Sequence, residues 1–344
     1  MAYTTIDKST DYYSTKKYSG TGSAQSITGV GFQPDWCWIK NASSGSNYSH
    51  QLYDTTRGVT KYLQSNSSAS ETTQAEGLTA FGTDGFSVGT NAGVNSNGST
   101  LISWNWKANG AGSANTNGSI NSTVSANTTS GFSIVTYTGT GANATVGHGL
   151  GSAPRLILFK QTNATQKWIV HHQSIGATKS LHLDTTEAEQ SNAFMNNTSP
   201  TSSVFSLGTI VNNNTSGATY VAYCFAEKKG FSKFGQYTGN GSTDGAFIFC
   251  GFKPALVIFK KTNDVGDWQM VDDKREGYNP DNDYLQANAS LAEQTTDIID
   301  LVSNGFKIRG DDSNGWNKNG STYLWIAFAK APLVGSNNVP ATAR

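Results

Sequence analysis

The sequence predicts an all-β protein built from three tandem jelly-roll-like β-sandwiches, and three observations support this. Runs of β-branched and aromatic residues recur every ~8 to 12 residues between clusters of Gly, Asn and Ser, a spacing typical of short strands and tight turns. The composition includes 37 Gly and only 14% charged residues, and Ser, Thr and Asn occupy most windows, which disfavours long helices. The third observation is an internal repeat.

The repeat consists of landmarks that keep nearly the same spacing in three segments of the chain. A Tyr-x-Gly-x-Gly motif is followed after 16 or 17 residues by a proline that opens an apolar run. A glycine 63 to 66 residues after the proline precedes the apolar run that closes each unit. Three units of about 100 residues therefore set the architecture. The motifs begin at Tyr18, Tyr137 and Tyr237, the prolines are Pro34, Pro154 and Pro254, and the closing glycines are Gly98, Gly217 and Gly320.

We place the repeats at 1–107, 130–228 and 229–332, with a Gly/Ser/Asn-rich linker at 108–129 and a C-terminal tail at 333–344. The first two prolines are 120 residues apart and the next two are 100 apart, so the linker accounts for the surplus. Its composition predicts a flexible linker or a surface loop, and a longer tether for repeat 1. The strand after each proline is apolar on both faces, so a loop or a neighbouring repeat must cover its second face.

Charge balance, hydropathy and cysteine usage exclude several classes of protein. The 24 Lys and Arg residues balance 24 Asp and Glu, which argues against a nucleic-acid binder with a basic surface. No apolar stretch is long enough to insert into a membrane, and the first residues lack the features of a signal peptide. Cys37, Cys224 and Cys250 each lie in an apolar run and are predicted to be buried free thiols.

The sequence has no His-Glu-x-x-His or Walker-A pattern. Its one Gly-x-Ser-x-Gly match, Gly85–Gly89, is a landmark of the internal repeat. The adjacent His171 and His172 would point to opposite faces of a strand, which favours a hydrogen-bonded or surface pair over a metal site. We therefore expect a protein without enzymatic activity. The alternative is a glycan-degrading enzyme, which needs two carboxylates about 5.5 Å apart, or ~6.5 to 9.5 Å apart if it inverts.

Acidic residues concentrate in repeat 3, and oxygen ligands of this kind suit Ca²⁺. The alternative is that they are solvated loop acids, and no other cofactor is expected. A separate pattern, Asp three residues before Arg, occurs at Asp54–Arg57 and at Asp272–Arg275 and predicts a turn closed by a local ion pair. The candidate calcium ligands are Asp272, Asp273, Asp281, Asp283, Asp311 and Asp312.

Exposed aromatic residues are the remaining candidates for a binding site. Sugar-binding sandwiches stack a pyranose ring on a flat side chain and hydrogen-bond its hydroxyls with Asn or Asp. Trp316, beside Asn317 in a polar loop, has this character, and Tyr278 and Tyr284 come next. The alternative is that these aromatic side chains pack on their own domain or on a neighbouring subunit.

The repeats, together with several specific segments, resemble a family of virion proteins from tailed bacteriophages. The similarity is greatest to those of marine phages, described as tail-fibre-like or concanavalin A-like lectin/glucanase-like, and it covers nearly the whole chain. Repeat 2 departs most, with Arg155–Phe159 in place of a Trp-rich strand. The shared motifs are strand and turn residues, so no catalytic or ligand residue is carried over. The segments are Ala2–Asp7, Gly31–Asn41, the Asp54-x-x-Arg57-Gly58 step, Asn97–Lys107 and Val339–Arg344.

The resemblance implies a virion surface protein that is made in the host bacterial cytoplasm and assembles with other virion proteins. The expected function is host attachment as a tail fibre or fibre-like protein, with a host surface glycan as ligand. The alternative is a capsid or tail decoration protein with a purely structural role. Edge strands that need a partner predict a homo-oligomer, and a trimer is one option.

Overall fold

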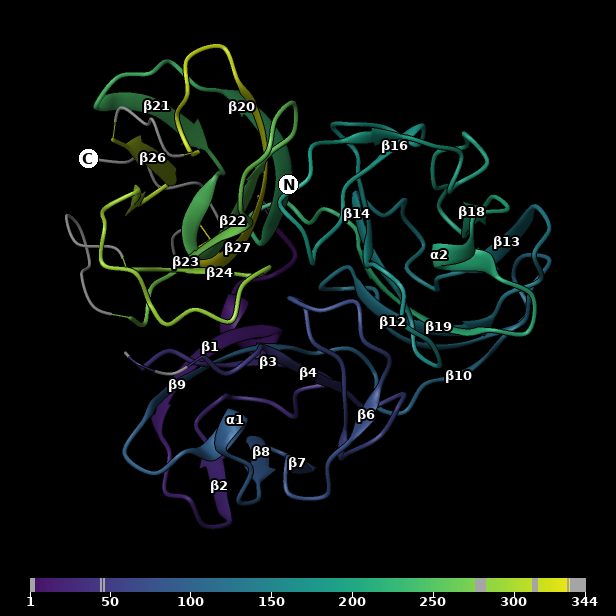
Figure 1. Cartoon of the computed structure of the whole chain (residues 1–344), viewed down its shortest axis with the longest axis horizontal. Helices are drawn as coiled ribbons and strands as arrows, with labels where there is room; N and C mark the ends of the chain where they lie inside the picture. The colour runs from purple at the N-terminus through teal and green to yellow at the C-terminus, as the bar shows by residue number, and fades with distance from the viewer. Residues whose placement is uncertain are drawn as a thin grey trace.

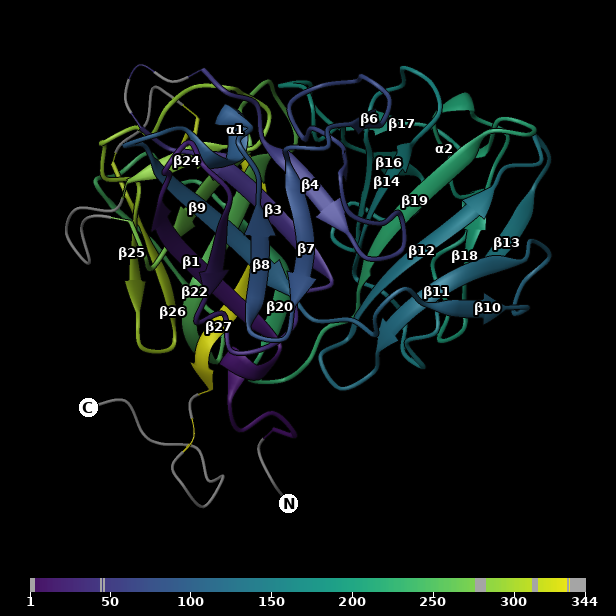
Figure 2. The ribbon, with the colours of Figure 1, turned by 90° about the horizontal axis from the view of Figure 1, so that it is seen from below.

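A computed structural model describes residues 4–43, 45, 47–275, 283–310, 315–332 and 334. The chain is nearly all-β with antiparallel sheets, which confirms the predicted class and is consistent with β-sandwich architecture. Every sheet is made by strands of one of three consecutive segments, which we call lobe 1 (4–107), lobe 2 (108–228) and lobe 3 (229–332). Figures 1 and 2 show the three lobes grouped around a common centre.

Lobe 1 has a large sheet in the order β1-β9-β3-β4, a smaller sheet β2-β8-β7 and the pair β5-β6. The strand after Pro34, β3, is buried along its whole length, as its two apolar faces predict. The elements of lobe 1 are η1 (Ser9–Asp11), β1 (Tyr13–Ser19), β2 (Gln25–Thr28), β3 (Trp36–Asn41), β4 (Gln51–Asp54), β5 (Lys61–Tyr62), β6 (Thr72–Thr73), β7 (Leu78–Gly82), β8 (Gly85–Val88), α1 (Ala92–Asn95) and β9 (Thr100–Trp106).

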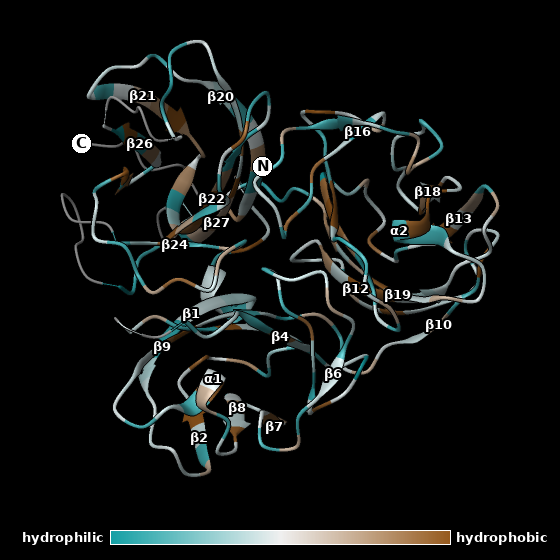
Figure 3. Ribbon diagram, in the orientation of Figure 1, coloured by the Kyte–Doolittle hydropathy of each residue, from teal (hydrophilic) through white to brown (hydrophobic). Residues whose placement is uncertain are grey.

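Lobe 2 has a large sheet in the order β10-β11-β12-β19-β14-β15 and two small sheets, β13-β18 and β16-β17. Figure 3 shows hydrophobic residues along β14, which follows Pro154 and is fully buried. The elements of lobe 2 are β10 (Ser113–Asn115), β11 (Ser122–Asn127), β12 (Phe132–Thr138), β13 (Ala144–Gly147), β14 (Leu156–Gln161), β15 (Ile169–His172), β16 (Lys179–Ser180), β17 (Gln190–Ser191), β18 (Val204–Leu207), α2 (Val211–Asn214) and β19 (Thr219–Phe225).

Lobe 3 has a large sheet in the order β20-β27-β22-β23-β24 and a smaller sheet β21-β26-β25. The long central pair β22 and β27 is antiparallel and crosses the middle of the lobe. The elements of lobe 3 are β20 (Ser232–Thr238), β21 (Asp244–Phe249), β22 (Phe252–Lys261), β23 (Gln269–Asp272), β24 (Tyr284–Gln286), β25 (Ile299–Val302), β26 (Gly305–Arg309) and β27 (Thr322–Pro332).

The prediction of a linker at 108–129 is wrong, because this segment forms two strands of the large sheet of lobe 2. β10 pairs with β11, and β11 pairs with β12 along its whole length. The start of the segment is fastened to lobe 1 by Asp35, whose carboxylate accepts the backbone N–H groups of Ala108 at 2.7 Å and Gly110 at 3.0 Å. Gly and Asn are depleted in strands, but these preferences are small, so pairing with the rest of the sheet can override them.

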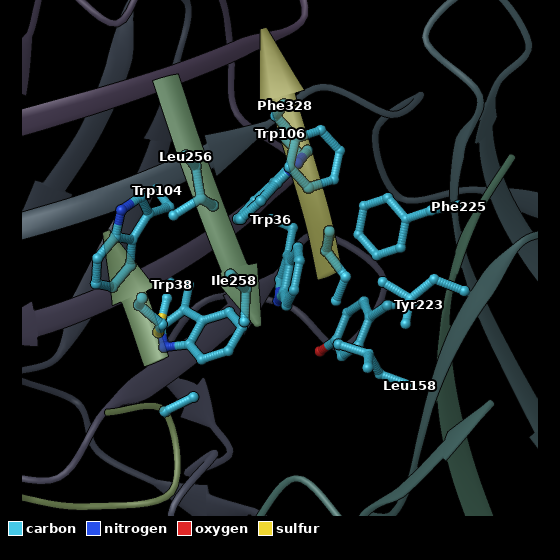
Figure 4. Close-up of a cluster of buried hydrophobic side chains, with 14 of the residues drawn as sticks. Trp36, Trp38, Trp104, Trp106, Leu158, Tyr223, Phe225, Leu256, Ile258 and Phe328 are labelled. Carbon is cyan, nitrogen blue, oxygen red and sulfur yellow. The ribbon is translucent and has the colours of Figure 1, made fainter. Parts of the chain in front are cut away.

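One shared core lies where the large sheets of the three lobes meet, and it covers the second face of the central strands (Figure 4). Side chains alternate along each strand between this shared core and the lobe's own core. In lobe 1, Trp36 and Trp38 enter the shared core, whereas Cys37 and Ile39 enter the core of lobe 1. Repeat 1 is therefore packed directly against repeats 2 and 3, and the expected longer tether is wrong.

Aromatic rings from all three lobes meet in the shared core. Trp36 stacks on Tyr223 of lobe 2 with ring centroids 4.4 Å apart. Phe225 of lobe 2 contacts Phe328 of lobe 3 at 5.5 Å, and Phe328 contacts Trp106 of lobe 1 at 5.4 Å. Each such pair contributes about 0.5–1.5 kcal/mol beyond the burial of its area. These contacts close a ring of lobes.

The contacts between lobes also repeat in a cyclic order. A lysine at the same position of each central strand is buried and donates from Nζ to a backbone carbonyl of another lobe. Burial is the main cause that lowers the pKa of all three lysines to about 8. Equivalent hydrogen bonds thus occur at all three boundaries between lobes, and the lobes have approximate threefold symmetry. The donors and acceptors are Lys40 to Ser290 at 3.3 Å, Lys160 to Ser68 at 2.8 Å and Lys260 to Thr186 at 3.3 Å.

Candidate functional site

The Asp54–Arg57 ion pair lies buried at the boundary between lobes 1 and 2. Arg57 Nε donates to Asp54 Oδ2 at 2.5 Å, and the Tyr223 hydroxyl of lobe 2 donates to the same oxygen at 2.7 Å. Burial alone would raise the pKa of Asp54, but Arg57 and hydrogen bonds from Thr56 and Tyr223 hold it below its ordinary value. The spacing predicted the ion pair correctly, but not its role in joining two lobes.

Equivalent contacts occur at the other two boundaries. Asp272 of lobe 3 accepts from Arg275 Nε at 2.8 Å and from Trp104 Nε1 of lobe 1 at 3.2 Å. In lobe 2 the corresponding residue is His172, whose Nε2 lies 3.2 Å from the carbonyl oxygen of Trp325 in lobe 3. Burial lowers the pKa of His172 to about 3, so its ring is neutral at pH 7. These charged and polar residues therefore connect the lobes.

The predicted calcium ligands do not converge among the residues that the structure describes. Asp272 is held by its arginine, and Asp273 pairs with Lys330 at 2.7 Å. Asp283 faces Glu293, and burial, followed by neighbouring acids that include Asp283, raises the pKa of Glu293 to about 7. No three His, Cys, Asp or Glu side chains form a metal-binding group in the described ranges. Asp281, Asp311 and Asp312 lie outside the described residues.

Trp316 and Tyr284 are buried, so the expectation of exposed sugar-stacking rings is wrong for both. They are 6% and 8% exposed, and their ring centroids lie 6.1 Å apart in the core of lobe 3. Trp316 Nε1 donates to the carbonyl oxygen of Arg309 at 2.8 Å. The alternative, packing on their own domain, is what the structure has. Tyr278 lies outside the described residues.

Asn317 is fully buried and holds a turn of lobe 3. Its Nδ2 donates to the carbonyl oxygens of Ser242 at 2.7 Å and Gly310 at 3.1 Å, and its Oδ1 accepts a backbone N–H of the Tyr-x-Gly-x-Gly motif. Asn95 and Asn214 make the same bonds in lobes 1 and 2. Each of the three precedes the closing glycine by three residues, a repeat landmark that identifies this Asn as structural.

Two phenylalanines on β21 depart from the symmetry of the repeats at the surface. Phe247 and Phe249 are 49% and 51% exposed and alternate with buried Ile248, so they share the outer face of the small sheet of lobe 3. Figure 3 shows hydrophobic residues in one part of β21. Isolated exposed apolar side chains are normal, whereas a pair on one strand face is a candidate binding surface.

The other lobes indicate that the fold does not need aromatic residues at these two positions. The register of the small sheets identifies the equivalents, because Ile248 pairs with Phe306 as Ile27 pairs with Phe86 in lobe 1. Small or polar residues stand at all four equivalent positions. Packing therefore does not explain the two rings, and a ligand or partner would. Phe247 corresponds to Ser26 and Thr145, and Phe249 corresponds to Thr28 and Gly147.

Charged side chains border the two rings. Lys233 Nζ lies 5.0 Å from the centroid of the Phe249 ring. Lys307 pairs with Asp244 at 2.7 Å, and the Asp244 side chain is 82% exposed. An aromatic surface with hydrogen-bonding groups around it is a combination that binds sugars and other partly polar ligands. We call these five residues the aromatic patch.

Two grooves at the lobe boundaries each contain one carboxylate in their described lining. The groove between lobes 1 and 2, of about 600 Å³, contains Glu71, which pairs with Arg57 at 3.0 Å and Lys61 at 3.6 Å. The groove between lobes 1 and 3, of about 440 Å³, contains Asp273 and its partner Lys330. Glycoside hydrolysis uses a pair of carboxylates about 5 to 9.5 Å apart, and neither described lining supplies this pair.

The fold and these surfaces define a nearly all-β protein of three lobes closed on one shared core. The chain belongs to the family described as "Domain of unknown function (DUF7483)", whose model matches residues 8–332. No curated protein matches the sequence. Within the described residues, no helix is long and apolar enough to cross a membrane. Cys37, Cys224 and Cys250 are buried and free, as predicted.

Proposed function

We propose that this chain is a non-enzymatic virion surface protein of a tailed bacteriophage, a tail fibre or fibre-like protein that attaches to the host by binding a surface glycan. The observation that carries the binding role is the exposed pair Phe247 and Phe249, which lobe 3 has and the other lobes lack. The ion-paired state of the carboxylate in each groove supports binding rather than hydrolysis.

The place in the particle rests on the resemblance to phage virion proteins. On this proposal the chain is made in the host bacterial cytoplasm, assembles with other virion proteins and forms a homo-oligomer. The rigid arrangement of the lobes suits a particle surface, because the shared core leaves no lobe free to move separately.

Localisation in purified phage particles tests the virion role. Mass spectrometry of the particles should detect the chain, and cryo-electron microscopy should place its three-lobed density at the tail or capsid surface. Detection in infected cells together with absence from purified particles would contradict the proposal.

Binding to host cells tests the aromatic patch. The double variant Phe247→Ser with Phe249→Thr introduces the residues that lobe 1 has at these positions, so we expect it to fold. Stacking on an aromatic ring contributes about 1 kcal/mol or more, so the variant should bind host cells roughly fivefold or more weakly. The control is Val211→Ser, which removes an apolar side chain that is 55% exposed on lobe 2. Equal binding by both variants would contradict the assignment of the patch.

A decoration protein with a structural role is the second candidate. The observation that favours it is the position of β21 at the edge of its sheet, where an exposed strand with apolar side chains can pack against a neighbouring protein. In that case the double variant would lose incorporation into particles, whereas the purified wild-type chain would bind no host cells and no host glycan.

A further inference from the structure

The groove between lobes 1 and 3 is lined by five lysines, and we call it the lysine groove. Its volume of about 440 Å³ lies within the roughly 300–1,000 Å³ range of small-molecule sites. One wall comes from the edge strand β1 and residues 29–31 of lobe 1, and the other from residues of β22, β27 and the turn after β23. The whole sequence is neutral and has only 24 Lys and Arg, so five in one groove is a local excess. The lysines are Lys8, Lys16, Lys17, Lys274 and Lys330.

Three of these lysines form no ion pair with any residue that the structure describes. Lys8 pairs with Asp11 at 2.7 Å, and Lys330 pairs with Asp273 at 2.7 Å. A positively charged concave surface raises the local concentration of anions and orients them before contact. The groove is therefore suited to a negatively charged ligand. The lysines that form no ion pair with the described residues are Lys16, Lys17 and Lys274.

One further acid at the border of the groove offsets part of this charge. Asp84 accepts the backbone N–H groups of Gly29 at 2.9 Å and Gly31 at 2.7 Å, and these two hydrogen bonds are the main cause of its lowered pKa. Lys16 also interacts with this carboxylate. With Asp84 counted against Lys16, the groove keeps the charges of Lys17 and Lys274, so the described residues give it a net positive charge.

The other two lobes show that the fold does not require these lysines. Tyr18, Tyr137 and Tyr237 occupy the same place in their sheets, which aligns β1 with β12 and β20. The equivalents of the three unpaired lysines are all uncharged. Their presence at one boundary is thus specific to lobes 1 and 3. Lys16 corresponds to Val135 and Gly235, Lys17 to Thr136 and Gln236, and Lys274 to Thr56 and Ser174.

We propose that the lysine groove binds an acidic saccharide, a sugar that bears carboxylate, sulfate or phosphate groups. The choice of a saccharide rests on the proposed binding of a host glycan. Lysine ammonium groups act as compact point charges, so they accept any of these anionic groups without the fixed geometry of arginine. The lining also combines hydroxyl groups with small apolar side chains, as ligand sites generally combine polar and apolar groups. The hydroxyl groups belong to Thr10, Ser14 and Thr15, and the apolar residues are Val30, Ala255 and Ala329.

Affinity electrophoresis of the full chain with polygalacturonate, dextran sulfate and uncharged dextran tests this proposal. The triple variant Lys16→Gln, Lys17→Gln and Lys274→Gln should bind the two acidic polymers about tenfold more weakly, because each lost charge contact contributes modestly at an exposed site. A matched triple control makes the same net-charge change on other surfaces and should keep its affinity within about twofold. Thermal unfolding confirms that each variant is folded. The control substitutions are Lys179→Gln, Lys229→Gln and Lys318→Gln.

The proposal is supported if the groove variant loses binding of the acidic polymers and the control variant keeps it. Equal losses in both variants, equal binding of uncharged dextran, or equally tight binding of a short DNA duplex would overturn it, because each indicates general polyanion or polymer attraction. Host-cell binding separates this proposal from the proposed function. If the chain binds cells and the groove variant is unaffected in all assays, the groove assignment alone fails. If the groove binds acidic polymers but the chain binds no cells, the attachment role fails.

Discussion

Replacement of Asp54 by Asn should destabilise the whole chain, although the residue lies in lobe 1. The substitution removes a fully buried carboxylate that receives Arg57 at 2.5 Å and Tyr223 of lobe 2 at 2.7 Å. Only 4% of the Arg57 side chain is exposed, so its charge would lose its main partner in the interior. Loss of one member of a buried ion pair costs about 3–5 kcal/mol, a large part of a typical total stability of about 5–15 kcal/mol.

The companion variant Tyr223→Phe removes the two hydrogen bonds of this hydroxyl to lobe 1, the one it donates to Asp54 and the one it accepts from Arg57 Nη2 at 3.3 Å. A hydrogen bond to a charged group contributes about 1.5–3 kcal/mol, so we expect a smaller loss from this variant. In the double variant the two losses should not add, because the tyrosine hydroxyl has no carboxylate to bind once Asp54 is replaced. The pKa of Asp54 is lowered in the folded state, so its contribution is complete above its ordinary pKa and is lost as the pH falls below it.

Urea unfolding followed by tryptophan fluorescence measures these free energies, since tryptophans lie in the shared core. The matched control is Asp11→Asn, which removes an exposed ion pair with Lys8 that also joins residues three apart. It should lower the free energy of unfolding by less than about 1 kcal/mol. A loss below about 1 kcal/mol for Asp54→Asn, or strict additivity with Tyr223→Phe, would refute the cyclic contacts between lobes.

Four further predictions rest on the shared core and the buried polar groups. The fragment 4–107 should not fold alone, because Trp36 and its neighbours would face water, and circular dichroism and exchange-protected amides would measure this. Burial lowers the pKa of His172 to about 3, so the unfolded chain binds more protons between about pH 6.5 and 3; stability should fall as the pH drops through this window, and less so in His172→Gln. The pKa of Lys160 is lowered to about 8, so the unfolded chain binds more protons at alkaline pH and stability should rise from about pH 8 to 10. Lys160→Met should flatten that rise, measured as the urea midpoint. Asn317→Ala should lose about 2–4 kcal/mol in urea unfolding from its buried hydrogen bonds yet leave polymer binding unchanged at temperatures where it stays folded, which would separate its structural role from the ligand role first expected of it.

The sequence predicted the all-β class and the strands that follow the prolines, because period-two patterns and turn residues are local signals. It also predicted the Asp54–Arg57 ion pair, whose members lie three residues apart. It did not predict Tyr223 as a partner, since that contact joins positions 169 residues apart. The aromatic patch was missed for a different reason: Phe247 and Phe249 lie in an apolar run, and only comparison with the aligned repeats shows that their equivalents are polar.

The wrong predictions concern the burial of a side chain and the ordering of a segment. Both depend on contacts with residues that are distant in the sequence. Trp316 in a polar loop was expected to be exposed, but its ring enters the core of lobe 3 beside Tyr284. The segment 108–129 was expected to be a linker, but it pairs with β12 and is fastened by Asp35. In both cases the local composition is compatible with either outcome, and contacts from other parts of the chain decide which one has the lower free energy.

The sequence by itself determined that this protein has three similar units, that each has strands apolar on both faces, and that either a loop or a neighbouring unit must cover the second face. Only the tertiary structure decided that the other two lobes supply this cover, arranged in a ring around Trp36, Phe225 and Phe328. The physical reason is that the alternation of side chains along a strand is set by a few consecutive residues. The burial of a whole sheet face depends instead on the packing of surfaces from all three repeats.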